Sequence, residues 1–148
     1  MGYDAGKKIK GRKRHLLVDT LGLVLGVAVT PASTPERAGG LALLATVLGW
    51  LKWFKRLWVD GGYTGEDFAE QARAHRPKLV VEVVKRSDLA QGFEELPHRW
   101  IVERTFAWLG INRRMSKDVE RFAQTSLAFI QAAMIKLMAR RLARFSYS

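Results

Sequence analysis

The chain has 148 residues, of which 48% are hydrophobic and 10% aromatic, so it can form a globular core and is not an intrinsically disordered protein. Its 25 Lys and Arg outnumber 14 Asp and Glu, and the resulting net charge of +11 favours a polyanionic partner, most often a nucleic acid. Cysteine is absent, which excludes disulfides and thiolate metal sites, and the three histidines lack zinc-hydrolase spacing, so any metal must have oxygen ligands. Because no apolar run approaches the roughly 18 residues of a membrane span and no signal peptide is recognisable, we expect a cytoplasmic protein with no membrane partner.

The first 14 residues are predicted to form a basic arm. Six cations occur within eight residues: Lys7, Lys8, Lys10, Arg12, Lys13 and Arg14. Such a concentration of charge is typical of a segment that contacts DNA phosphates, and a solubilising tail is the alternative.

The remaining pattern alternates between strands and helices. Two β-rich runs, 15–19 and 23–30, flank a glycine-containing turn and predict a hairpin. Then follow a helix over 36–53, a strand over 55–60, an amphipathic helix over 66–76 and a strand over 79–84. Helices are predicted again over about 97–111 and 123–144. This order predicts an α/β fold with a mixed sheet, and the absence of a linker predicts one domain over residues 1–148.

Asp60 is the first candidate site residue. It ends an apolar strand and precedes Gly61 and Gly62. An acid in this position faces solvent at the edge of a sheet, where α/β proteins place their ligand sites. The alternative is that Asp60 only forms the turn, since Asp favours turns.

Glu103 is the second candidate. It lies within residues 99–109, a segment that is apolar on nearly every side of a helix, where an ionised carboxylate needs a partner or a metal. An ion pair with Arg99 is the alternative. If the strand end and the helix converge, Asp60 and Glu103 would form a divalent-cation site of the kind used in phosphodiester chemistry.

A second group of cations follows this helix, at Arg113, Arg114, Lys117 and Arg121. It could clamp a phosphate backbone. A merely solvated face is equally consistent with the pattern, because Asp118 and Glu120 interrupt it.

Three stretches together carry a resemblance to a known family. They are Gly-Tyr-Asp-Ala-Gly-Lys-Lys at 2–8 with Gly-Arg-Lys-Arg-His at 11–15, Val-Asp-Gly-Gly-Tyr at 59–63, and Trp-Ile-Val-Glu-Arg-Thr-Phe-Ala-Trp-Leu at 100–109. From its first residues to about Arg141 the chain resembles DDE transposases of bacterial insertion sequences, in the insertion-sequence-five-like group. The resemblance implies an RNase H-like fold, two Mg²⁺ ions that Mn²⁺ can replace, and DNA cleavage and strand transfer at the ends of the element. It also implies a double-stranded DNA partner, a nucleoid-associated location and a homodimer that pairs two DNA ends.

By position, Asp60 is similar to the second catalytic acid of the family and Glu103 to its glutamate, and Arg99 matches the arginine four residues earlier. Two signature positions depart from the family pattern, where a tyrosine is replaced by Leu96 and a lysine by Gly110. Arg113 or Arg114 is a candidate for the phosphate contact of that lysine.

The first catalytic aspartate of the family lies on a strand upstream of the stretch at 2–8. The chain starts inside this stretch, and neither Asp4 nor Asp19 is expected to replace the missing acid. In an RNase H-like sheet that strand is central, so without it two neighbouring strands lose backbone hydrogen-bond partners and the isolated chain should be prone to association. We therefore expect a truncated or split transposase, feebly active or inactive alone, that an upstream segment would complete.

Two other functions remain open. A non-catalytic DNA-binding protein that inhibits transposition would bind DNA in a salt-sensitive manner without needing Glu103. A general RNA-binding protein would account for the charge, but no RNA-recognition motif supports it.

Overall fold

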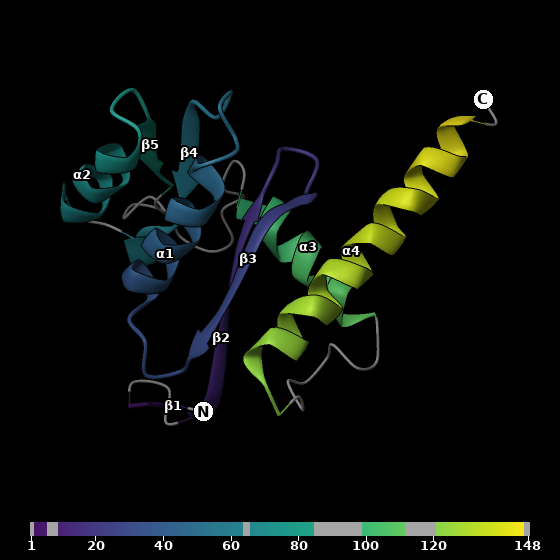
Figure 1. The fold of residues 1–148 in the computed structure, drawn as a ribbon, viewed down its shortest axis with the longest axis horizontal. Coiled ribbons are helices and arrows are strands. Elements are labelled where there is room, and N and C mark those ends of the chain that lie inside the picture. Colours follow the sequence, from purple (N-terminus) through teal and green to yellow (C-terminus); the bar gives the residue numbers. More distant parts are fainter. Residues whose placement is uncertain (1, 6–8, 64–65, 85–98, 112–120, 147–148) are drawn as a thin grey trace, which may run out of the picture.

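The computed structural model describes residues 2–5, 9–63, 66–84, 99–111 and 121–146 (Figure 1). The elements in chain order are β1 (Gly2–Asp4), β2 (Ile9–Val18), β3 (Val24–Pro31), α1 (Glu36–Leu48), β4 (Arg56–Val59), the 3-10 turn η1 (Gly61–Tyr63), α2 (Glu66–His75), β5 (Val80–Val83), α3 (Arg99–Gly110) and α4 (Ala123–Ser146). The predicted mixed α/β class is confirmed. The prediction of one mixed sheet is not, because the described strands form two separate sheets, antiparallel β1-β2-β3 and parallel β4-β5, and β1 was not predicted.

Strands β2 and β3 form the predicted hairpin. They pair antiparallel from Arg12 opposite Pro31 to Val18 opposite Val24, with an irregularity after Leu17. Strand β2 begins earlier than predicted, because its first residues pair with β1, Gly2 lying opposite Gly11. Residues 9–14 of the predicted basic arm therefore belong to a β-strand.

The hairpin turn is fixed by the side chains of Asp19, within the turn, and Thr105 of α3. The Asp19 carboxylate accepts hydrogen bonds from the amides of Leu21 and Leu23, each at 2.9 Å, which confirms its predicted place at the turn. Gly22 has a φ of 80°, a conformation that favours glycine, and its carbonyl accepts a 2.7 Å bond from the buried Thr105 hydroxyl of α3. The hairpin is thus tied to the helix that carries Glu103.

Helices cover both faces of the hairpin (Figure 1). Because side chains alternate along a strand, Leu17 points toward α1 and Leu16 toward α4. The larger buried cluster lies on the α1 side and consists of Leu17, Leu43, Leu44, Val47, Leu48, Leu51, Phe54, Leu57, Phe68, Ala72 and Leu79. This cluster joins the hairpin to α1, α2, β4 and β5.

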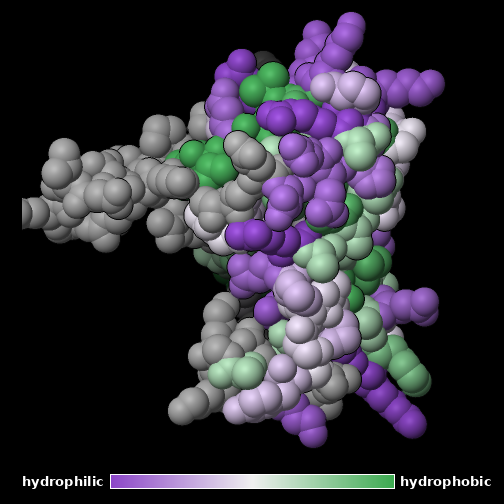
Figure 2. All heavy atoms as spheres, turned by 90° about the vertical axis from the view of Figure 1, so that its left-hand side faces the viewer, coloured by the Kyte–Doolittle hydropathy of each residue, from purple (hydrophilic) through white to green (hydrophobic). Residues whose placement is uncertain are grey.

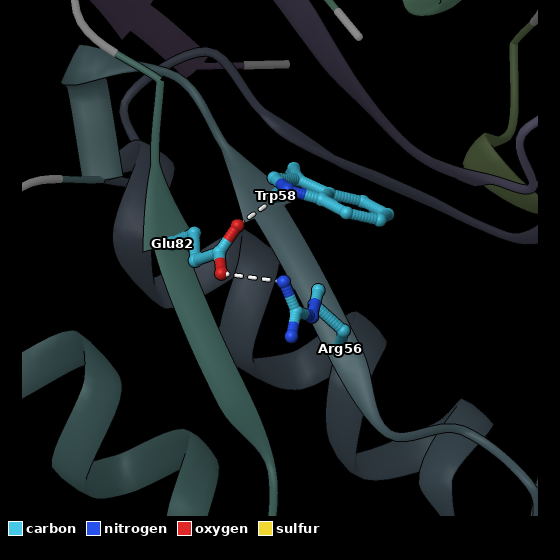
Figure 3. Close-up of polar contacts among 3 residues, drawn as sticks. All are labelled: Arg56, Trp58 and Glu82. Atoms are coloured by element: carbon cyan, nitrogen blue, oxygen red, sulfur yellow. Dashed lines mark hydrogen bonds and ion pairs between the residues drawn. The ribbon is translucent and has the colours of Figure 1, made fainter.

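Strands β4 and β5 form a separate parallel pair, connected through α2, with Arg56 opposite Val80 and Val59 opposite Val83. On this pair the Glu82 carboxylate accepts a bond from the Arg56 guanidinium at 2.8 Å and one from the Trp58 indole at 2.6 Å (Figure 3). Both are cross-strand contacts that hold β4 and β5 in register.

Helix α1 ends at Leu48, earlier than the predicted residue 53, and its end is fixed by Arg76. The Arg76 guanidinium donates to the carbonyls of Leu48, Leu51, Lys52 and Phe54 at 2.7 to 3.0 Å. The bond to Leu48 satisfies a carbonyl that the helix end leaves without an intrahelical partner, and the other three hold the segment that follows the helix. The arginine therefore positions the segment that leads into β4.

The outer surface of α1 and α2 is largely hydrophilic, as Figure 2 shows from the left-hand side of Figure 1. No helix of the described residues combines the length and apolarity that a bilayer crossing demands.

Helix α1 approaches its neighbours closely at glycine. A Cβ added at Gly40 would lie 2.7 Å from Cε1 of Tyr63, whereas one added at Gly49, just after the helix, would come no closer than 3.6 Å to its nearest neighbour. We expect Gly40→Ala to lower the free energy of unfolding by about 1–3 kcal/mol through overpacking.

Gly49→Ala is the matched control, because Gly49 has right-handed helical angles and the substitution should be neutral or mildly stabilising. Urea unfolding of both variants measures the difference. Equal stability of the two would show that the contact between Gly40 and Tyr63 is not tight.

Candidate functional site

Asp60 lies immediately after β4 and its side chain is exposed. Its Oδ1 accepts a 3.0 Å bond from the amide of Gly62, and its carbonyl accepts a 3.1 Å bond from the amide of Tyr63. The residue thus forms the turn, as the alternative interpretation predicted. The same geometry leaves an exposed carboxylate at the end of an apolar strand, as the site interpretation predicted.

Glu36, in the first turn of α1, is a neighbour of Asp60 that the sequence did not indicate. A Cβ added at Gly62 would lie 2.9 Å from Oε2 of Glu36 and 3.1 Å from Oδ1 of Asp60, so both carboxylates border the same point. An acid in the first turn of a helix is ordinarily explained by the helix dipole, so only the packing of α1 against η1 reveals its second role. The two carboxylates create a region of negative potential beside η1.

The negative potential affects the pKa of Tyr63. Burial, followed by the nearby charges of Glu36 and Asp60, raises its pKa from 10.0 to about 12. Its ring packs against Phe68 of α2, with ring centroids 5.2 Å apart, and occupies the space beside Gly40. Tyr63 therefore anchors the turn that carries Asp60 between α1 and α2.

His15 is buried on the other side of α1. The Thr30 hydroxyl lies 2.9 Å from its Nε2, and the ring fills the space that a side chain at Gly39 would need. Burial lowers its pKa, and the positive charge of Lys13 acts in the same direction, against the opposing effect of Glu36. His15 is thus a buried hydrogen-bonding residue in the contact between the hairpin and α1.

Glu103 lies in α3, as predicted. The helix packs through Ile101, Thr105 and Leu109, which are buried. Position 103 falls on another side, which it shares with Phe106 and Gly110, both exposed. The side chains of Glu103 and Arg99 lie outside the described residues, so their predicted convergence with Asp60 stays a prediction.

The predicted DNA-binding cations divide between strand β2 and undescribed segments. Lys10, Arg12 and Arg14 alternate along β2 and so share one face of the sheet. Arg12 donates a 2.6 Å bond to the carbonyl of Arg121, just before α4, while Lys13, on the other face, donates one at 3.0 Å to the carbonyl of Thr34. Lys7, Lys8, Arg113, Arg114 and Lys117 lie outside the described residues.

Trp108 of α3 forms a cationic cluster that the sequence did not predict. The guanidinium of Arg104 lies 4.7 Å and that of Arg141 4.5 Å from the indole. Both arginines also donate to the carbonyl of Leu21 in the hairpin turn, at 3.0 and 3.4 Å. The cluster joins α3, α4 and the hairpin, so Trp108 has a packing role at their junction.

A cavity of about 260 Å³ separates the two sheets. It is lined by Leu16, Leu17, Val18, Asp19, Thr20, Leu25, Trp53, Phe54, Lys55, Arg56, Leu57, Trp58 and Ile101. Consecutive residues of a strand point to opposite faces of the sheet. Because residues 16–18 of β2 and 56–58 of β4 all line the cavity, the cavity lies at the edges of these strands and not on one face of either. Within the described parts of the chain, β4 pairs only with β5, and β1 reaches only the first residues of β2.

Comparison with known proteins identifies the family. The model of the transposase DDE domain family matches residues 1–138. The chain belongs to this family. A protein named as a transposase of insertion sequence element IS402, from Burkholderia cepacia, is 28% identical over 128 residues. This similarity covers 82% of the chain but 59% of the relative, and no solved structure matches the chain.

Within the described residues no three acidic or histidine side chains gather into a metal-binding group. The transposase chain thus presents Asp60 next to Glu36 and Tyr63, with position 103 in a helix fixed to the same hairpin.

The raised pKa of Tyr63 predicts a pH dependence of stability. The neutral phenol is favoured in the folded state, so its contribution is complete below pH 10.0 and is lost as the pH rises toward about 12. Tyr63→Phe should therefore lose less stability than the unsubstituted protein over this interval. Urea unfolding at several pH values measures the difference, and parallel curves for the two proteins would contradict the raised pKa.

Proposed function

We propose that the chain is the catalytic part of an insertion-sequence transposase that cleaves DNA at the ends of the element and joins it to target DNA. The observation that carries this proposal is the exposed carboxylate of Asp60 at the end of β4, in a chain that belongs to the DDE transposase family. The family generally uses divalent metal ions.

Asp60 and Glu103 are the residues proposed to hold these ions, Mg²⁺ or, as a substitute, Mn²⁺. Carboxylate oxygens are the ligands that such cations prefer, and Asp60 offers an exposed carboxylate beside a second acid, Glu36. Bound there, the cations would stabilise charge on the attacking and leaving oxygens of a phosphodiester. The contribution of the chain is to fix the carboxylates, and η1 does so for Asp60 through the Tyr63 anchor.

We infer that the fold is RNase H-like and that a further strand completes it. In the antiparallel register of β1 and β2, Gly2 lies opposite Gly11. A segment that continued β1 upstream in this register would run beside β2 toward Val18, along the edge that borders the cavity. The cavity between β2 and β4 lies where such a strand would pair, which supports a catalytic sheet that a further strand completes.

Double-stranded DNA is the proposed partner, both as transposon end and as target. Lys10, Arg12 and Arg14 share a face of β2, and Arg99, Arg113, Arg114 and Lys117 with the basic arm 1–14 are proposed to add to it. Acting on chromosomal DNA, the protein would work at the nucleoid, and the pairing of two ends would require a homodimer.

A non-catalytic inhibitor of transposition is the second candidate. The cavity between β2 and β4 favours it, because a sheet that lacks a strand can keep its cationic face without a complete catalytic site. This candidate needs the cations but neither Asp60 nor Glu103.

Nicking of a supercoiled plasmid that carries the ends of the element, in Mg²⁺ or Mn²⁺, tests the proposal. We expect feeble nicking that Asp60→Ala and Glu103→Ala both abolish, because each would remove a cation ligand. Asp19→Asn is the matched control, since Asp19 serves the hairpin turn and the amide oxygen can accept the same bonds.

Nicking that persists in Asp60→Ala would contradict the assignment of this residue. Absence of nicking, together with DNA binding that weakens steeply with salt and does not need Glu103, would favour the inhibitor. Vigorous nicking that depends on Asp60 would instead show that the chain needs no further strand.

A further inference from the structure

Exposed aromatic rings and cations lie together on the segment between α1 and β4, which the proposed function does not use. Trp50 and Trp53 are exposed by 59% and 64%. The exposed side chains of Lys52 and Lys55 alternate with them along the chain, and no acid occurs from residue 37 to residue 59. These two tryptophans and two lysines are called the tryptophan–lysine surface below.

The neighbouring segment before β5 adds to the positive charge. The amide of Val80 donates a 3.0 Å bond to the carbonyl of Lys55, so the chain around the exposed Lys78 runs beside the tryptophan–lysine surface. Residues 71–81 also contain no acid, and Glu82, further along β5, is already held in two cross-strand contacts. The two lysines of the surface have no ionic partner among the described residues.

The backbone of the tryptophan–lysine surface is fixed before any partner binds. Leu51 and Phe54 each follow one of the tryptophans, and both are buried in the larger cluster, with 2% and 8% exposure. The Arg76 guanidinium donates four bonds to carbonyls of this segment and of the end of α1. Because the exposed indoles project from an ordered segment, little backbone entropy would be lost when they bind a partner.

The composition of the surface favours a polyanion that presents flat rings. Lysine is depleted from the cores of protein interfaces, so indoles interleaved with lysines do not fit an ordinary protein partner. Proteins that bind single-stranded nucleic acids combine the same two features, aromatic rings that stack on bases and cations that contact phosphates. Only unstacked bases offer their faces to such rings, so a duplex would engage the lysines but not the indoles.

We propose that the tryptophan–lysine surface binds single-stranded DNA, with both indoles stacked on unpaired bases and both lysines at the adjacent phosphates. The choice of DNA over RNA rests on the proposed function. The surface is separate from the proposed cation site, because β4 begins beside it and Asp60 follows the other end of this strand, roughly 15 Å away. It is also more than the mouth of the cavity between the sheets, whose lining includes neither Trp50 nor Lys52.

Fluorescence anisotropy of a labelled oligothymidylate of about ten nucleotides, mixed with the intact chain in EDTA, tests the proposal. We expect Trp50→Ala and Trp53→Ala each to raise the dissociation constant about 5- to 100-fold, because each removes a stacking ring. Trp50→Phe and Trp53→Phe keep a ring and should restore part of the affinity. Phe145→Ala is the matched control, since it removes an 80% exposed ring from the end of α4 and should have no effect.

Salt separates the contribution of the rings from that of the cations. Lys52→Gln should weaken binding at low salt and have a smaller effect at high salt, because salt screens phosphate contacts. The fold-change caused by each tryptophan variant should be the same at both salt concentrations. Binding of a hairpin duplex should not change in the tryptophan variants.

Several results would overturn the proposal: unchanged binding by the tryptophan variants, an equal loss in Phe145→Ala, or an equal loss for the duplex. Tighter binding of an oligouridylate would overturn the choice of DNA, and tryptophan-dependent binding of polyglutamate in place of oligothymidylate would assign the surface to an acidic protein. Because EDTA removes divalent cations, this binding can persist where nicking fails, and nicking can persist where this binding fails. Circular dichroism of each variant excludes unfolding as the cause.

Discussion

The architecture depends on the close packing of helix α1. It reaches the hairpin where Gly26 of β3 admits Val47, and it reaches η1 where Gly40 admits the ring of Tyr63. A side chain at either glycine would force the elements apart, since a Cβ at Gly26 would overlap Cγ2 of Val47. The helix thereby joins the hairpin, which is tied to α3, to the turn that carries Asp60.

This role of α1 matters because, among the described residues, no backbone ladder joins the two sheets. Strands β2 and β3 belong to one sheet, β4 and β5 to another, and a cavity lies between them. The larger buried cluster on the α1 side must therefore hold the two sheets at their present distance. Side-chain packing allows the sheets to slide more readily than a ladder of backbone hydrogen bonds does. The further strand that we propose would fill this cavity, add backbone hydrogen bonds between the two sheets and thereby fix Asp60 relative to α3.

Sequence periodicity predicts much of this fold, because the hairpin, α2 and β4 each have an apolar pattern with a clear turn or proline beside them, and α4 has apolar residues at helical spacing. It misplaces the start of β2, because the cationic run at 10–14 becomes a strand only through pairing with β1 and β3. It also misses Glu36 beside Asp60, the Arg76 contacts and the Arg104–Trp108–Arg141 cluster, since each joins elements distant in sequence. The exposed position of Asp60 was predictable from one apolar strand and the two glycines after it, whereas its distance from Glu103 depends on how β4 and α3 pack.

The most direct test of the account is paramagnetic broadening by Mn²⁺ in NMR spectra of the isotopically labelled chain. If Asp60 and Glu103 share a cation, the amide signals of Gly61–Tyr63 and those of α3 around Glu103 should broaden together at low Mn²⁺, and Asp60→Asn should suppress both effects. Broadening confined to one of these segments, or unchanged by the substitution, would contradict a shared site.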